Sequence, residues 1–210
     1  MNASLPGGPV LPIMKTPRVR LQLPQLQDSP AWGVILNNPK TMQYLRFMTM
    51  SEQGWDEARI AARILRHQQL TLAGEGCLYD LFVQDTLIGN AGFQDWMPDK
   101  KEASFGIIVH HPWWRQGLAT EVFLYLLEYG FSQLKLEHIY FKTAFDNTRM
   151  QSFFDRFAIP FNHISRHDVI NRDGQPEDYR VYSLSRQQWP RTKQLLEEAL
   201  YQNAMNQKFA

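Results

Sequence analysis

The chain has 210 residues, with 22 Lys and Arg against 21 Asp and Glu, so its formal charge is +1. This balance excludes the strong basic excess of general nucleic-acid binders and of proteins held at anionic membranes. A hydrophobic fraction of 44% is sufficient for a folded core, and one cysteine, Cys77, excludes an internal disulfide framework. We therefore expect a folded cytoplasmic protein whose partners include neither nucleic acid nor a membrane.

The length corresponds to one domain with extensions. Residues 1–16 contain the run PGGP and lack the basic front end and apolar block of a secretory signal, so they are expected to form a flexible leader. Residues 17–189 are expected to form the domain, and residues 190–210 a C-terminal helical extension. No run of about 18 apolar residues is present, so no transmembrane helix is expected. Monomer and homodimer both fit.

The first half of the domain alternates between strand and helix patterns. The segment RVRLQL (18–23) alternates polar and apolar residues, which indicates a half-buried strand. Helical patterns follow at 31–36 and 55–69. Two strands at 78–83 and 87–93, joined by a short polar link, predict a hairpin, and an apolar strand at 103–109 suits the centre of a sheet.

The second half predicts a strand, loop and helix unit and then a hairpin. The helix is expected from about residue 117 to 131, after a glycine-containing loop. A strand at 138–144 precedes a helix at 146–157 that opens with a good capping signal. Strands at 163–170 and 178–184 surround the polar turn NRDGQ, and a last helix follows Pro190. This order predicts one α/β domain on a mixed sheet.

The strongest candidate site is the loop between residues 109 and 121. The first amides of a helix are unpaired donors at the positive end of its dipole, so they favour an anion. Gly117 lets the backbone come close to a ligand, Ala119 is small, Thr120 adds a hydroxyl and Arg115 adds charge. These features predict a phosphate or diphosphate ligand. An ordinary turn that uses Gly117 for its conformational freedom also fits the loop by itself.

The string HPWWRQGLATE, which ends at Glu121, is preceded by FGIIV and followed by Asp146 and Asn147. This pattern resembles the acyl-CoA signature of the GNAT N-acyltransferase superfamily, and within it the Rim-type branch of ribosomal-protein-alanine N-acetyltransferases. RVRLQLPQLQD resembles the opening strand of that family and YRVYSLSRQQW its closing strand, so the likeness spans residues 16–189. The resemblance implies a mixed, mostly antiparallel sheet that is flanked by helices and splayed at the acyl-CoA site.

The resemblance also implies a coenzyme site. The diphosphate of acetyl-CoA would be held by the main-chain amides of Arg115, Gln116, Gly117, Leu118, Ala119 and Thr120. The pantetheine arm would lie along Ile107, Ile108 and Val109, where a backbone N–H could stabilise an oxyanion. Asn147 matches the family asparagine that contacts pantetheine or a bridging water, although a plain helix cap fits it equally well. Acetyl-CoA is the expected co-substrate, and no metal is expected.

The position of the family's general base departs from the pattern. Many relatives carry a carboxylate two residues before the glycine of the central strand, which is Ser104 before Gly106 in this chain. Glu102 lies two residues further back with the same strand parity, so it projects toward the same face. Glu102 is the candidate base, directly or through water. A solvated charge following Lys101 is the alternative.

The position of the general acid departs as well. The family tyrosine seven residues after the asparagine is Phe154 here, and the Rim-type serine three residues after it is Met150. Neither side chain can donate a proton. Ser152 and Tyr140 are the nearby alternatives, and a structural role fits each of them too. The predicted catalytic set is Glu102, Ser104 and Ser152.

Two functions follow as expectations. The first is an acyl-CoA-dependent N-acyltransferase, in which a primary amine of a peptide N-terminus, a lysine or a small molecule attacks acetyl-CoA directly. The second is a catalytically weakened acyl-CoA-binding or protein-interaction module that has lost its proton-handling groups. Acid–base help typically supplies about 10²- to 10⁴-fold, whereas positioning reaches effective molarities of about 10⁵ to 10⁸ M, so the losses do not exclude catalysis.

Overall fold

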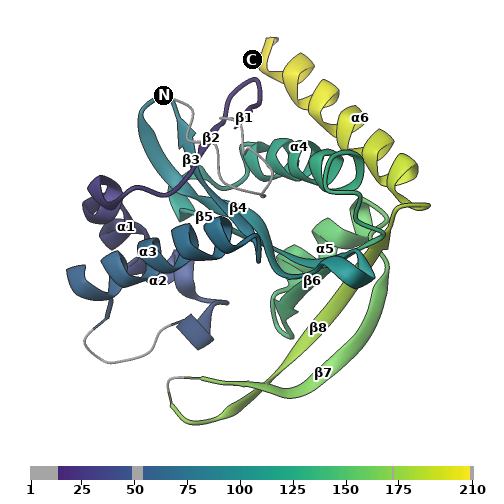
Figure 1. The fold of residues 1–210 in the computed structure, drawn as a ribbon. Helices are drawn as coiled ribbons and strands as arrows, with labels where there is room; N and C mark the ends of the chain where they lie inside the picture. The colour runs from purple at the N-terminus through teal and green to yellow at the C-terminus, as the bar shows by residue number, and fades with distance from the viewer. Residues whose placement is uncertain (1–13, 49–53, 172, 209–210) are drawn as a thin grey trace.

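The structure, a computed structural model, describes residues 14–48, 54–171 and 173–208. The described strands form one eight-stranded sheet in the order β1-β2-β3-β4-β5-β6-β8-β7 (Figure 1). Only β5 and β6 pair in parallel; every other neighbouring pair is antiparallel. The strands are β1 Met14–Lys15, β2 Arg20–Gln22, β3 Cys77–Val83, β4 Thr86–Met97, β5 Glu102–Val109, β6 His138–Ala144, β7 Phe161–Ile170 and β8 Pro176–Ser185. The predicted mixed, mostly antiparallel sheet is confirmed.

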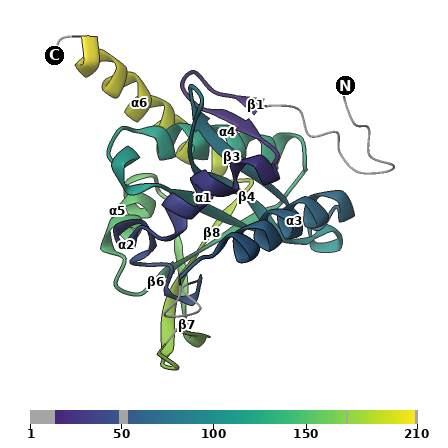
Figure 2. The same cartoon turned by 90° about the vertical axis from the view of Figure 1, so that its left-hand side faces the viewer.

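Helices cover both faces of the sheet. One layer holds α1 Ser29–Leu36, α2 Pro39–Met42 and α3 Glu57–Ala73, which face the viewer in Figure 2. The other layer holds α4 Leu118–Ser132, α5 Thr148–Arg156 and α6 Trp189–Lys208. Short 3-10 turns complete the chain at η1 Leu26–Asp28, η2 Arg46–Met48, η3 Pro98–Lys100 and η4 His111–Trp113.

Each face of the sheet carries its own core. Beneath α4 and α5, aromatic rings dominate: Phe105, Phe123, Phe141 and Phe154 are buried, with the Phe123 and Phe141 centroids 5.8 Å apart. Beneath α1 and α3, a smaller cluster surrounds the buried Trp32. Buried aromatic side chains contribute a large apolar area to core stability. Because alternate residues of a strand point to opposite faces, the two cores share the strands between them.

Glycine is required where β4 meets the second half of β5. Gly89 pairs with Val109 and has φ of 151°, and a Cβ at this position would lie 1.9 Å from the carbonyl oxygen of Ile108. Real Cβ atoms cannot approach so closely, so a side chain here would push β4 away from β5. Gly89 therefore lets β4 stay paired with β5 as far as Val109.

The predicted elements are present, with shifted ends. The helix expected at 55–69 is α3 at Glu57–Ala73, which Gly74 ends with φ of 71°, and β4 runs beyond the predicted 93 to Met97. These shifts arise because capping and strand pairing set the end of an element more than hydrophobic periodicity does. The expected leader at 1–16 lies outside the described residues except for its end, where Met14–Lys15 form β1.

The C-terminal extension belongs to the packed body. Leu196 and Ala199 of α6 are buried in the core that α4 also lines. Trp189 donates from its indole nitrogen to Glu128 at 3.0 Å, which fixes the start of α6 against α4. Figure 1 shows α6 lying along the outer side of α4, while the β7–β8 hairpin projects away from the body. None of the helices in the described ranges is both long and apolar enough to cross a membrane.

Candidate functional site

The central feature of the site is a gap between β5 and β6. The parallel register pairs residues 102–105 with 138–141 and ends at Phe105 and Phe141. Beyond that point β5 continues beside β4 and β6 continues beside β8, so the two strands separate. The β6-facing edge of residues 106–109 has no strand partner within the described ranges. An extended, amide-containing ligand could pair with such an edge as an added strand.

The predicted coenzyme residues Ile107, Ile108 and Val109 all lie on this open stretch. Ile108 packs with the cluster around Trp32, whereas Ile107 contacts the opposite core. The indole nitrogen of Trp114 donates to the carbonyl oxygen of Val109 at 2.6 Å. That bond ties the end of β5 to the loop that follows it.

The loop from η4 to α4 presents consecutive main-chain amides. Arg115 and Gly117 have φ of 63° and 75°, and α4 begins at Leu118. Within the described part of the chain, none of the amides of residues 115–120 donates a hydrogen bond, and the first helical bond is from Glu121 to Gly117 at 3.1 Å. Unpaired donors at the positive end of a 15-residue helix favour an anion. The predicted stretch Arg115 to Thr120 thus lies together as one donor surface.

Gly117 is constrained from behind the loop. A Cβ at this position would lie 3.0 Å from the side-chain nitrogen of Asn203 and 3.4 Å from a terminal nitrogen of Arg18. The left-handed backbone already favours glycine. Glycine is therefore required for its φ and for close packing against α6 and the N-terminal segment. The expected close approach of a ligand at Gly117 stays a prediction.

A cavity of about 340 Å³ lies beside this loop and is lined by His111, Pro112, Trp114, Arg115 and Arg149. The guanidinium of Arg149, in α5, lies 5.2 Å from the centre of the Trp114 ring. Two guanidinium groups beside an aromatic ring suit a ligand that carries both phosphate and a flat base. Arg149 was not predicted. The sequence feature that could have indicated Arg149 is its position in the first turn of α5, the helix that Asn147 caps.

Asn147 caps α5, and its side-chain amide is engaged at both ends. Its Oδ1 accepts from the amide of Met150 at 3.3 Å, and its Nδ2 donates to the hydroxyl of Thr143 at 2.9 Å. The residue is buried, with 8% of its surface exposed. The capping alternative is therefore present, and one Nδ2 hydrogen is left for a ligand. Its coenzyme contact stays a prediction.

Two of the three predicted catalytic residues lie together. Ser104 is the register partner of Tyr140 across the parallel pair, and Glu102 is that of His138. The hydroxyl of Tyr140 lies 3.4 Å from Oε1 of Glu102, and Nδ1 of His138 lies 3.9 Å from the same oxygen. Burial, with the negative charge of Glu102 and the hydrogen bond to it, raises the pKa of Tyr140. The phenol therefore holds its proton at neutral pH.

The third predicted residue, Ser152, is on the exposed surface of α5. It does not join Glu102 and Ser104, and its catalytic role stays a prediction. Phe154, which replaces the family tyrosine, is buried against Phe141 and Tyr182, at centroid distances of 5.4 and 4.5 Å. The usual position of the acid is thus part of the aromatic core.

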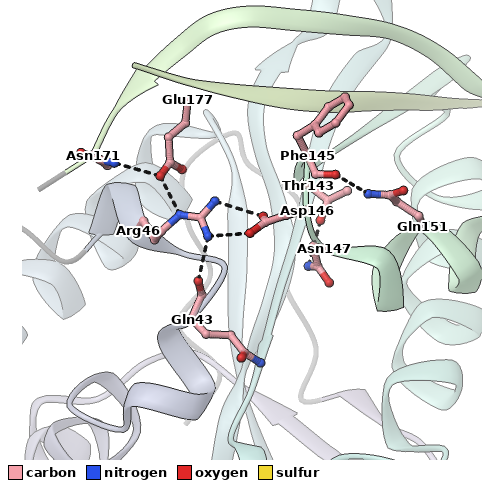
Figure 3. A network of polar contacts seen from close by, with 9 residues as sticks. All are labelled: Gln43, Arg46, Thr143, Phe145, Asp146, Asn147, Gln151, Asn171 and Glu177. Atoms are coloured by element: carbon pink, nitrogen blue, oxygen red, sulfur yellow. Dashed lines mark hydrogen bonds and ion pairs between the residues drawn. The ribbon is translucent and has the colours of Figure 1, made fainter. Parts of the chain in front are cut away.

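A network around Arg46 joins three elements next to the gap (Figure 3). The two terminal nitrogens of Arg46 each bind one oxygen of Asp146 at 3.0 Å, and its Nε donates to Glu177 at 2.6 Å. Asn171 donates to the same Glu177 oxygen at 3.0 Å. The hydrogen bond from Arg46 lowers the pKa of Asp146. The network connects η2 to the loop that carries Asn147 and to the start of β8.

Sequence patterns did not reveal this network, because Arg46 is 100 residues from Asp146 and 131 from Glu177. Bidentate binding of a carboxylate by a guanidinium is geometrically specific and charge-assisted. Such a contact holds the η2 segment against the β6–α5 loop. This contact, here called the wall, lies at the loop that follows β6, the strand that separates from β5 beyond Phe141.

Comparison with known proteins identifies the family. The acetyltransferase (GNAT) domain family matches residues 18–157, so the chain belongs to the GNAT family. Over 179 residues the chain is 26% identical to the uncharacterized N-acetyltransferase YoaA of Bacillus subtilis (strain 168), covering 83% of this chain and 97% of that protein. The chain is accordingly an N-acetyltransferase, as the sequence predicted.

Solved structures share the fold. A GCN5-related N-acetyltransferase from Brucella melitensis aligns with a TM-score of 0.75 at 16% identity, over 89% of this chain and 84% of that one. RimL, a ribosomal L7/L12 alpha-N-protein acetyltransferase in complex with coenzyme A, aligns with a TM-score of 0.69 at 16% identity, over 83% and 96%. At these identities the likeness shows a shared fold.

Proposed function

We propose that the chain transfers the acetyl group of acetyl-CoA to a primary amine, by direct attack within a ternary complex. The amine belongs to a peptide N-terminus, a lysine or a small molecule. The observation that carries the proposal is the run of free amides at residues 115–120, directly beyond the open edge of β5. A diphosphate and a pantetheine arm need these two surfaces in this order.

In this proposal the amides of residues 115–120 bind the diphosphate. Arg115 and Arg149 bind the remaining phosphate and adenine beside Trp114, in the 340 Å³ cavity. The pantetheine arm runs along residues 106–109, and Asn147 contributes its remaining amide hydrogen. The structure of RimL contains coenzyme A in the same fold, which supports this use of the site.

The chemistry requires one bond to form and one to break. The amine nitrogen attacks the thioester carbonyl carbon, and a main-chain N–H near Ile108 or Val109 stabilises the oxyanion. The C–S bond then breaks and coenzyme A leaves as a thiolate. The ammonium form must first lose one proton to give the attacking amine, and the nitrogen loses a second proton as the amide forms. The thiolate gains one proton, and the other leaves to solvent.

Proton transfer is assigned to the pair of Glu102 and Tyr140. Glu102 accepts the amine proton through water, and the Tyr140 hydroxyl supplies the proton that the thiolate needs. The contact of 3.4 Å between them supports this pair better than it supports the exposed Ser152. Ser104, the register partner of Tyr140 and two residues from Glu102 on β5, is assigned to orient the water.

The test is thiol release by the purified full chain. Acetyl-CoA is mixed with a panel of N-terminal peptides, lysine derivatives and small amines, and free thiol is measured with and without each amine. Amine-dependent release, with acetylated product seen by mass spectrometry, supports the proposal. Tight binding of acetyl-CoA in calorimetry without release across the panel would favour the binding module instead. No binding at all overturns both.

A further inference from the structure

We propose that Arg18 is a positioning residue, which aims the main chain of the phosphate-binding loop at the diphosphate of the coenzyme. The inference rests on the proposed function and adds a role for the N-terminal segment before β2. Arg18 lies outside the loop and reaches it from behind. Its contacts determine which way one peptide group of the loop points.

Arg18 is anchored by a buried carboxylate. Its main-chain nitrogen lies 2.7 Å from Oε1 of Glu121 and its Nε lies 2.8 Å from Oε2. Thr16 donates to the same carboxylate. Glu121, in the first turn of α4, has 4% of its surface exposed. Since hydrogen bonds to a desolvated charge are among the stronger ones in proteins, this anchor fixes the guanidinium in place.

The free end of the guanidinium then binds the loop. Its Nη1 donates to the carbonyl oxygen of Gln116 at 2.8 Å. The described peptide bonds are all trans, and in a trans peptide the C=O and the following N–H point in opposite directions. The N–H of Gly117 must therefore point away from Arg18, toward the front of the loop. This N–H is one of the six unpaired amides.

The loop needs such support because its backbone is not self-supporting. Arg115 and Gly117 flank Gln116 in left-handed conformations, with φ of 63° and 75°. A left-handed residue with a side chain is strained and persists only where its surroundings hold it. On the other side, the Gln116 side chain donates to the carbonyl oxygen of Pro112 at 3.1 Å. The loop is thus held at two points: Arg18 binds the main-chain carbonyl of Gln116, and the Gln116 side chain binds the carbonyl of Pro112.

A simple electrostatic role gives a different prediction from a positioning role. If Arg18 only attracted the anionic coenzyme, then removing the negative charge of Glu121 would strengthen binding. If Arg18 positions the loop, Glu121→Gln frees the guanidinium and weakens binding, although the site becomes more positive. The sign of the change in Kd for this one variant separates the two roles.

The experiment measures acetyl-CoA binding by calorimetry for the wild type and for Arg18→Gln, Arg18→Lys and Glu121→Gln. We expect Arg18→Gln to raise Kd by about tenfold or more, Arg18→Lys by less, and Glu121→Gln by several-fold. Arg20→Gln is the matched control, because Arg20 contacts Gln22 and Gln84 and not the loop. Its Kd should equal that of the wild type.

S-acetylpantetheine separates positioning from general damage, because it lacks the diphosphate. Turnover of this thioester with an amine should be the same for Arg18→Gln, Arg18→Lys and the wild type, while turnover of acetyl-CoA falls. Equal loss with both thioesters, or tighter binding of acetyl-CoA by Glu121→Gln, overturns the inference. If Arg18→Gln does not fold, Arg18→Lys and Glu121→Gln decide the question.

The two proposals fail in different ways. Wild-type protein that does not bind acetyl-CoA overturns the proposed function, and the inference with it. Wild-type protein that binds acetyl-CoA, with folded variants that bind it equally well, overturns only the role of Arg18. The melting temperature of each variant without ligand shows whether it is folded.

Discussion

Arg46 binds Asp146 through two parallel hydrogen bonds of 3.0 Å, although 100 residues separate them in the chain. Asp146 directly precedes Asn147, which caps α5 beside the gap between β5 and β6. The same guanidinium binds Glu177, whose side chain is 12% exposed. One side chain therefore connects the η2 segment, the β6–α5 loop and the β7–β8 hairpin at the wall of the proposed active site.

Arg46→Gln should raise KM for the amine about tenfold while leaving the Kd for acetyl-CoA within about twofold, because the wall moves but the phosphate loop does not. Arg46→Lys should recover only part of the loss, since an ammonium cannot bind a carboxylate in bidentate fashion. Steady-state kinetics with both substrates varied measures this split. Arg191→Gln, an exposed change on α6, is the control. An unchanged amine KM would contradict the role of the wall.

Glu102→Gln should lower kcat by about 10²-fold with little change in the Kd for acetyl-CoA, because it removes the proposed base without touching the coenzyme site. Tyr140→Phe, which removes the hydroxyl 3.4 Å from Glu102, should lower kcat as well. Wild-type kinetics in Glu102→Gln would show that Glu102 is only a surface charge.

Gly117→Ala should lower both stability and coenzyme affinity, and Gly117→Glu should abolish acetyl-CoA binding. Left-handed backbone costs a residue with Cβ roughly 1–2 kcal/mol, and the new Cβ would lie 3.0 Å from the Asn203 amide. The double variant Gly117→Ala with Asn203→Ala should recover part of the melting temperature, since it removes the crowding but not the strain. Full recovery of the melting temperature would show that contact with the Asn203 side chain, and not backbone strain, accounts for the loss of stability in Gly117→Ala. An unchanged Kd in Gly117→Glu would contradict the phosphate site.

Asn147→Ala should lower the free energy of unfolding by about 1 kcal/mol, because the cap of α5 is lost. Asn147→Asp keeps an oxygen for the Met150 amide but loses the donor to Thr143. Thermal unfolding and calorimetry on both variants separate the two roles of Asn147. If Asn147→Asp binds acetyl-CoA as tightly as the wild type, the residue is a cap and nothing more.

Two groups with shifted pKa values, Asp80 of β3 and His67 of α3, give a pH prediction. Asp80 is fully buried and accepts from the Trp32 indole at 3.1 Å, and burial raises its pKa to about 7. Burial lowers the pKa of His67 to about 3, helped by the charges of Arg63 and Arg66. Between pH 4 and 7 Asp80 is more fully protonated in the native state than in the unfolded chain. Its contribution to the free energy of unfolding therefore decreases as the pH rises. The contribution of His67 changes in the opposite direction, because its pKa is lowered in the native state: it increases the free energy of unfolding as the pH rises.

Asp80→Asn should therefore reveal the slope due to His67, with the free energy of unfolding rising by roughly 2–4 kcal/mol from pH 4 to 7. In the wild type the two slopes offset one another. His67→Gln should instead leave the falling slope of Asp80. Denaturant unfolding at several pH values measures each slope. Parallel curves for the wild type and Asp80→Asn would show that Asp80 does not titrate in this range.

The order of strands and helices was predictable because each element carries a local pattern. The alternation in β2, the apolar run of β5 and the spacing of α4 are set by which face of each element is buried. The ends of α3 and β4 were not predictable in this way. The cap at Gly74 ends α3, and strand pairing beyond residue 93 extends β4.

By itself the sequence determined the family and predicted the coenzyme loop, since residues 113–121 form one continuous motif at the start of a helix. Only the tertiary structure decided what surrounds that loop. The contacts of Arg18 with Glu121, of Arg46 with Asp146 and of Arg149 with Trp114 join segments far apart in the chain. Their partners are selected by sheet register and helix packing, and no local periodicity encodes a contact between distant segments.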